Sequence, residues 1–110
     1  MPKKRRSRRI DSIVRGLLAY EPQAVYLFGS WARDENDELS DVDLVIIKRT
    51  CLPFFDRLME ASKHLPADAG GIDLLVYTPE EFHTMLREGN AFAEMIAEES
   101  ILIYGHKQEN

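Results

Sequence analysis

The sequence predicts an α/β or α+β domain in which one sheet of about four strands is covered by helices. Two observations support this prediction. Apolar runs of strand length alternate along the chain with stretches in which apolar residues recur every three or four positions. The chain also has 110 residues, 45% of them hydrophobic, which fits one domain with one core.

The helices expected in the first half of the chain cover residues 10–20 and 53–65. In the first, apolar residues recur at helical spacing until Pro22 ends the pattern. In the second, Pro53 occupies the first turn, where its missing N–H costs nothing. The apolar stripe of the first helix consists of Ile10, Ile13, Val14, Leu17 and Leu18.

The clearest helix start in the sequence is at Thr78. Thr78 suits the N-cap, Pro79 the first helical position, and Glu81 completes a capping box. We expect this helix to run to residue 87, where a Gly-Asn pair follows, and a further helical segment over residues 91–99.

Four apolar runs are expected as strands. The first is bounded by Pro22 and Gly29 and is nearly continuous, which is typical of a strand inside a sheet. After it we expect a Gly-Ser turn, a short helix or turn over residues 31–33 and a polar loop over residues 34–40. The four runs are residues 24–28, 41–47, 72–77 and 101–104.

Charge is unevenly distributed along the chain, whose net charge is −5. Six of the 14 Lys and Arg residues lie within residues 3–9, which leaves eight against all 19 Asp and Glu in the remainder. We therefore expect a disordered basic tail over residues 1–9, a domain over residues 10–105 and a C-terminal tail over residues 106–110. An acidic body is a poor nucleic-acid binder, so contact with nucleic acid would run through the basic tail. The alternative is a merely solvated tail.

Cys51 is the only cysteine, so the sequence forms no internal disulfide and no Cys-rich metal site. His64, His83 and His106 show no ligand spacing to one another. No signal peptide follows the basic start, and no apolar run approaches the roughly 20 residues of a membrane span. These features predict a cytoplasmic protein without a membrane segment.

Asp41 and Asp43 open the second expected strand. Because successive side chains of a strand alternate between faces, both carboxylates project to the same side. Two like charges so close repel one another, and a divalent cation removes the conflict. Hard oxygen ligands suit Mg²⁺ or Mn²⁺. The alternative is a solvated acidic pair, but the apolar run after Asp43 argues against it.

Asp73 is the first polar residue of the third expected strand. If the second and third strands are neighbours, Asp73 lies beside Asp41 and Asp43. Three carboxylates around one or two divalent ions are the arrangement of two-metal catalysis. Gly29 and Ser30 precede these acids at a strand-to-helix turn, where a glycine lets phosphate approach the backbone.

The Gly29-Ser30 pair, ten intervening residues and Asp41-Val42-Asp43 resemble the signature of the polymerase-β-like nucleotidyltransferase superfamily. The segments at residues 31–33 and 40–44 look most like the minimal nucleotidyltransferases. One departure is visible, because relatives often carry Gly where this chain has Asp34. It puts the turn beside the phosphates in doubt and touches no metal ligand.

The resemblance implies a polymerase-β-like fold and a division of roles among the site residues. Asp41, Asp43 and Asp73 would hold two Mg²⁺ ions, with Asp73 also activating the acceptor hydroxyl. Gly29 and Ser30 would hold the β- and γ-phosphates of ATP. Arg33 would be a further phosphate contact or, alternatively, a surface arginine paired with Asp34 or Glu35.

Minimal nucleotidyltransferases are commonly encoded beside a HEPN-domain protein, so the resemblance implies a HEPN toxin as partner. The reaction would transfer AMP from ATP to a tyrosine of that toxin and release pyrophosphate. Two alternatives stay open. One is a non-catalytic antitoxin that acts by contact, and the other is nucleotidyl transfer to a small molecule. The missing acceptor site favours a homo- or hetero-oligomer.

Overall fold

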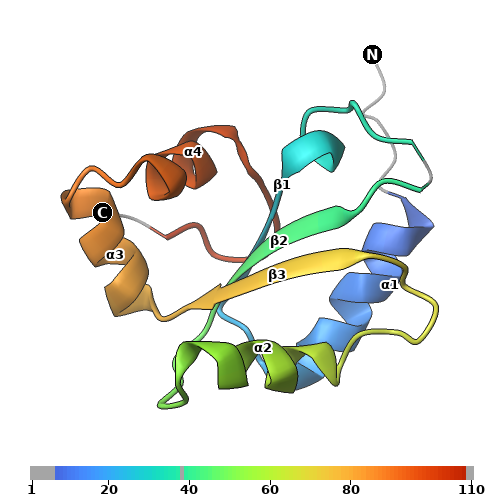
Figure 1. Cartoon of the computed structure of the whole chain (residues 1–110), viewed down its shortest axis with the longest axis horizontal. Helices are drawn as coiled ribbons and strands as arrows, with labels where there is room; N and C mark the ends of the chain where they lie inside the picture. Colours follow the sequence, from blue (N-terminus) through green and yellow to red (C-terminus); the bar gives the residue numbers. More distant parts are fainter. Residues whose placement is uncertain (1–6, 38, 109–110) are drawn as a thin grey trace.

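The computed structural model describes residues 7–37 and 39–108 (Figure 1). Residues 3–6 of the expected basic tail and the last two residues of the chain lie outside the described residues. The elements in chain order are α1 (Arg8–Leu17), η1 (Leu18–Tyr20), β1 (Ala24–Phe28), η2 (Gly29–Trp31), β2 (Val42–Ile47), α2 (Phe54–Ser62), β3 (Ile72–Tyr77), α3 (Pro79–Arg87), α4 (Ala91–Glu99) and β4 (Ile101–Gly105).

The four strands form one mixed sheet in the order β3-β2-β1-β4. β1 pairs antiparallel with both β2 and β4, whereas β2 and β3 run parallel. The hydrophobic clusters place α1 and α2 against one face of the sheet and α3 and α4 against the other (Figure 1). The predicted fold class is therefore confirmed.

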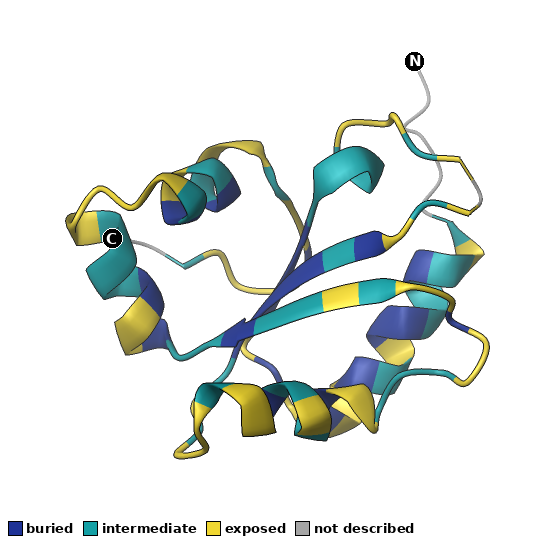
Figure 2. Ribbon diagram, viewed as in Figure 1, coloured by how far each residue is buried: buried dark blue, intermediate teal, exposed yellow. Residues whose placement is uncertain are grey.

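Strand β2 is buried on both faces, whereas β3 is mostly half-buried (Figure 2). Leu44 and Ile46 belong to the cluster on the α1 side, and Val45 and Ile47 to the cluster on the α3 and α4 side. A continuous apolar run is what a strand covered on both faces requires. Asp43 continues the second face at the start of β2, where apolar packing gives way to carboxylates.

Several expected elements are confirmed to the residue: β1, β3, α3 and α4. The capping box at the start of α3 is also present. The Thr78 hydroxyl accepts from the Glu81 N–H at 3.1 Å, and Glu81 Oε1 accepts from the Thr78 N–H at 2.9 Å. Local signals were sufficient here because each of these elements has a clear start or stop residue.

The N-terminal helix differs from the expectation. It begins at Arg8 rather than at residue 10, because the Ser7 hydroxyl accepts from the Ile10 N–H at 3.0 Å and caps it. Arg8 and Arg9 are therefore helical and not part of a disordered tail. The helix ends at Leu17, and the last expected turn is a separate 3-10 helix, η1.

Smaller differences concern the ends of other elements. Helix α2 is shorter than the expected 53–65, and β2 begins one residue after Asp41. β4 extends to Gly105. Beyond it, the expected C-terminal tail contacts β1, since the Gln108 N–H donates to the Tyr26 hydroxyl at 2.6 Å.

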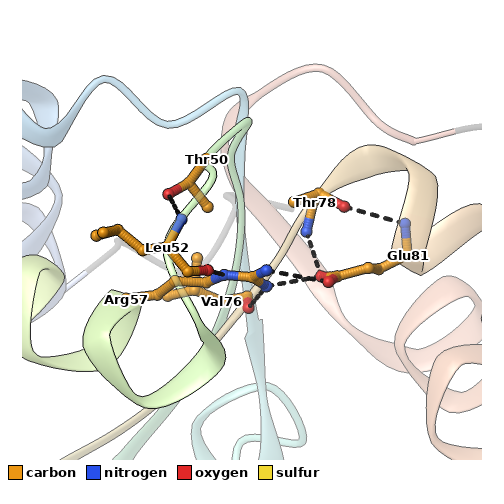
Figure 3. Close-up of polar contacts among 6 residues, drawn as sticks. All are labelled: Thr50, Leu52, Arg57, Val76, Thr78 and Glu81. Atoms are coloured by element: carbon orange, nitrogen blue, oxygen red, sulfur yellow. Dashed lines mark hydrogen bonds and ion pairs between the residues drawn. The ribbon is translucent and has the colours of Figure 1, made fainter.

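Arg57 joins α2, β3 and α3 at one end of the sheet (Figure 3). Its Nη1 and Nη2 donate to the two carboxylate oxygens of Glu81 at 2.7 and 3.0 Å. Its remaining bonds go to the carbonyls of Leu52, at 2.8 Å, and Val76, at 3.2 Å. Arg57, a residue that is 7% exposed, thus has all three guanidinium nitrogens in hydrogen bonds, as burial of a charge requires.

No helix within the described part of the chain is both long enough and apolar enough to cross a membrane.

Candidate active site

Asp43 and Asp73 are direct neighbours in the sheet. β2 and β3 run parallel with Asp43 opposite Asp73, so both side chains project to the same face. On the other side of β2, Phe28 lies opposite Asp43, and Gly29 follows it. The adjacency on which the sequence argument for Asp73 depended is present.

Asp41 lies one residue before β2 and is exposed. Its carboxylate packs against Gly71, where an added Cβ would overlap the Asp41 oxygen. The Gly71 carbonyl also accepts from the Val42 N–H at 3.0 Å, which joins the starts of β2 and β3. Sequence reasoning placed Gly71 only in a loop, because a glycine needed for a contact 30 residues away leaves no local signal.

The turn after β1 brings backbone against Asp43. Gly29 has φ of +73°, which glycine adopts without strain, and a Cβ at Gly29 would overlap the Asp43 carboxylate. The helical turn η2 begins at Gly29 rather than at residue 31, and it is three residues long. A turn this short has little dipole, so a phosphate here would depend on backbone N–H groups and the half-buried Ser30 hydroxyl.

The pKa of Asp43 is raised above its ordinary value. Burial is the largest cause, followed by the hydrogen bond and charge of Asp73 and by the charge of Asp41. The charge of Arg33 offsets part of this rise. The site therefore concentrates negative charge, and a cation would lower its energy.

Arg33 is exposed and pairs with Glu35, with Nε at 2.7 Å from Oε1. This is the surface ion pair that the sequence left open as the alternative for Arg33. Its positive charge slightly offsets the rise in the pKa of Asp43, which burial and the neighbouring carboxylates cause. A phosphate contact for Arg33 stays a prediction. To make it, the guanidinium would have to leave Glu35 and bind the phosphate instead.

Asp34 adopts φ of +59°. This is the left-handed region that glycine enters freely and that Asp tolerates better than most residues. The position where relatives often carry Gly thus keeps a glycine-like conformation here. The effect of Asp34 on phosphate binding stays a prediction, and φ alone shows that the backbone there is of the kind glycine favours.

The three carboxylates suit Mg²⁺ or Mn²⁺ in their chemistry. Asp43 and Asp73 project to one face of the sheet, Asp41 lies just before β2, and carboxylate oxygens are the hard donors that these ions prefer. Within the described residues no group of three His, Cys, Asp or Glu side chains is close enough to form a finished metal cluster.

Arg9 is the second residue near the site that sequence reasoning missed. Sequence reasoning assigned Arg9 to the basic tail. In the structure its guanidinium donates to the carbonyls of Ser40, Ala69 and Gly71. The available signal was Ser7, an N-cap residue three positions before Ile10, where the apolar stripe begins.

A Gly-Ser turn beside strand carboxylates on a small mixed sheet defines a nucleotidyltransferase-type domain. Comparison with protein families is more specific: residues 11–109 match the family Polymerase beta, Nucleotidyltransferase, and the chain belongs to this family.

Two solved structures are similar to the chain. One, from a crystal structure of a toxin–antitoxin with AMP-PNP, is 22% identical with a TM-score of 0.61, and the match covers 89% of this chain and 74% of that chain. The other is a candidate nucleotidyltransferase from Sulfolobus solfataricus, 21% identical with a TM-score of 0.51, covering 97% and 96%. At these identities the likeness shows the fold. No protein with a curated description matches the sequence.

Proposed function

We propose that the protein is a Mg²⁺-dependent nucleotidyltransferase that transfers AMP from ATP to a hydroxyl of a partner protein. The observation that supports this most is the register of the sheet, which sets Asp43 opposite Asp73 and next to the Gly29 turn. Membership of the polymerase β family supports the same activity. We expect it to act in the cytoplasm.

The residues divide the work as follows. Asp41, Asp43 and Asp73 would hold the ions, which supply charge stabilisation at the α-phosphate and its leaving group. The backbone N–H groups of the Gly29 turn and the Ser30 hydroxyl would bind the β- and γ-phosphates. Arg33 would contact the phosphates from the exposed side.

In the reaction, the acceptor oxygen attacks the α-phosphorus in line with the bond to the bridging oxygen. That bond breaks, and its electron pair leaves with pyrophosphate. Asp73 would take the proton of the acceptor hydroxyl, because it is exposed at the edge strand and open to a bulky acceptor.

We further propose that the acceptor is a tyrosine of a HEPN-type toxin and that the protein is the antitoxin. The fold similarity to a chain from a toxin–antitoxin solved with AMP-PNP supports this. An antitoxin that acts by contact alone is the competing possibility, and it needs no chemistry at the carboxylates.

The test uses α-labelled ATP, Mg²⁺ and the protein encoded by the neighbouring gene. We expect label on the partner and an intact-mass increase of one or more AMP units. The Asp41→Asn, Asp43→Asn double variant should transfer none, while Asp56→Asn, which removes an exposed acid on α2, should transfer normally. A double variant that still neutralises the partner without transfer would favour the contact mechanism.

A further inference from the structure

Arg9 binds the segments that carry two of the site carboxylates. Its guanidinium donates three hydrogen bonds to backbone carbonyls: Nε to Ala69 at 2.6 Å, Nη1 to Ser40 at 2.7 Å and Nη2 to Gly71 at 2.9 Å. Ser40 immediately precedes Asp41, and Gly71 lies two residues before Asp73. One side chain on α1 therefore fixes the entry to β2 and the entry to β3 at the same time.

Trp31 links the phosphate turn to the same point. Its Nε1 donates to the Ser40 carbonyl at 3.1 Å, so this carbonyl accepts from both Trp31 and Arg9. The Arg9 Cζ also lies 5.6 Å from the centroid of the Trp31 ring. Trp31 is the last residue of η2, the turn that begins at Gly29. The Gly-Ser turn and both strand entries thus meet at one guanidinium.

The arrangement depends on the shape of arginine. A planar fork can direct three N–H groups at three fixed carbonyls, whereas a lysine ammonium is a single point charge on a flexible stem. Gly70 fits this fork closely, since its φ is +83° and a Cβ there would lie 2.7 Å from Arg9 Nη2. Because all three guanidinium nitrogens donate to backbone, Arg9 is engaged in holding loops rather than pointing at a phosphate.

We propose that Arg9 is a positioning residue of this site: it sets the spacing of Asp41, Asp73 and the Gly29 turn against the repulsion of the carboxylates. The inference deepens the proposed function and rests on it where it concerns metal binding. The carboxylates on these segments repel one another, and the three hydrogen bonds of Arg9 oppose their separation. Residues that orient metal ligands in this way typically change metal affinity when they are replaced.

The test compares Arg9→Met with Arg9→Lys and with Arg8→Met, a control that removes the same charge from an exposed neighbour on α1. Mn²⁺ is the probe, and its affinity is measured by electron paramagnetic resonance. Trp31 is the only tryptophan of the chain, so its fluorescence reports on the contact with Arg9. Amide exchange at Val42, whose N–H donates to Gly71, reports on the two strand entries.

We expect Arg9→Met to bind Mn²⁺ on the order of 10-fold more weakly, with Trp31 emission at longer wavelength and faster exchange at Val42. Arg9→Lys should lie between it and the wild type, and Arg8→Met should match the wild type. If Arg9→Met does not fold, Arg9→Lys carries the same comparison, because it keeps the charge and loses the fork.

Wild-type Mn²⁺ affinity in a folded Arg9 variant would overturn the positioning role. Unchanged Trp31 emission and Val42 exchange would overturn it as well, whatever the metal affinity. A wild-type protein that binds no Mn²⁺ would instead contradict the proposed function, and the fluorescence and exchange would still decide whether Arg9 holds the loops.

Discussion

The two ends of strand β3 carry charge in opposite ways. Near Val76, the Arg57 guanidinium is buried against Glu81, and each charge has its opposite within 3.0 Å (Figure 3). At the other end, Asp73 lies opposite Asp43, and burial together with the neighbouring carboxylates raises the pKa of Asp43. The six residues of β3 thus run from a group of neighbouring carboxylates at one end to an ion pair of opposite charges at the other.

We interpret the charges of Arg57 and Glu81 as structural and those of the carboxylates at the other end as functional. The Arg57–Glu81 pair holds three elements together and meets its own hydrogen-bonding needs. Repulsion among the carboxylates at the other end is unfavourable, and side chains with perturbed pKa values are frequent at functional sites. The predictions below exchange or remove charges at each end, beginning with the largest expected effect.

On the proposed function, replacing Asp43 by Asn should lower AMP transfer by about a thousand-fold, because an interaction that would stabilise charge in the transition state is lost. In the absence of metal, the same variant should melt at a higher temperature than the wild type, because the repulsion is relieved. Transfer assays and thermal unfolding in EDTA measure the two effects. A variant that loses stability together with activity would show that Asp43 is a structural acid.

Replacing Arg57 by Met should lower the free energy of unfolding by about 3 kcal/mol and leave AMP transfer by the folded protein intact. The low end of the range for buried pairs applies, since the Glu81 side chain is 44% exposed. The double variant with Glu81→Gln should recover part of the loss, because no uncompensated partner then remains. Denaturant titration tests this, and strict additivity of the two substitutions would contradict the pairing.

The sequence was sufficient wherever a local rule decides the structure. Thr78 and Pro79 start α3, and the apolar run after Asp43 forms the buried strand β2. The prediction for Asp73 needed one further condition, that its strand be the neighbour of β2. The sheet order β3-β2-β1-β4 satisfies that condition.

The sequence was insufficient where contacts join distant segments. Arg9 and Ala69 are 60 positions apart, and within a run of basic residues Arg9 looks like part of a solvated tail. Gly71 has no turn signature that announces the Asp41 carboxylate beside it. No local signal marks Arg57, whose partner Glu81 lies 24 residues further on. Such pairings become visible only when the sheet order is known.

Gly29 and Gly89 have nearly the same backbone conformation, so comparing their variants separates an effect on the carboxylate site from the effect of backbone strain. Gly29 and Gly89 have φ of +73° and +72°, but a Cβ at Gly29 overlaps the Asp43 carboxylate and a Cβ at Gly89 meets nothing within 4 Å. Either Gly→Ala variant should lose about 1–2 kcal/mol through the left-handed backbone. Only Gly29→Ala should also lose Mn²⁺ and nucleotide binding, measured by calorimetry. Equal binding by the two variants would remove Gly29 from the site.

The smallest expected effect is a pH dependence of opposite sign at the two ends, measured in EDTA. The folded pKa of Asp43 is raised, so its stabilising contribution is present below its ordinary value of 3.8 and is lost as pH rises through the folded value. The Asp43→Asn variant has no carboxylate at this position and does not lose stability in this way. Its melting temperature should therefore match that of the wild type at low pH and exceed it increasingly above 3.8.

Glu81 follows the reverse course, because its hydrogen bond to Arg57 lowers its folded pKa below the ordinary value of 4.5. Its stabilisation is present above 4.5 and is lost as pH falls through the folded value. Glu81→Gln should therefore be less stable than the wild type near neutral pH and should converge with it in acid. Thermal unfolding of the two variants and the wild type from about pH 3 to about pH 7 tests both signs at once. If both variants shift in the same direction at neutral pH, the two ends of β3 do not differ in the way that their contacts indicate.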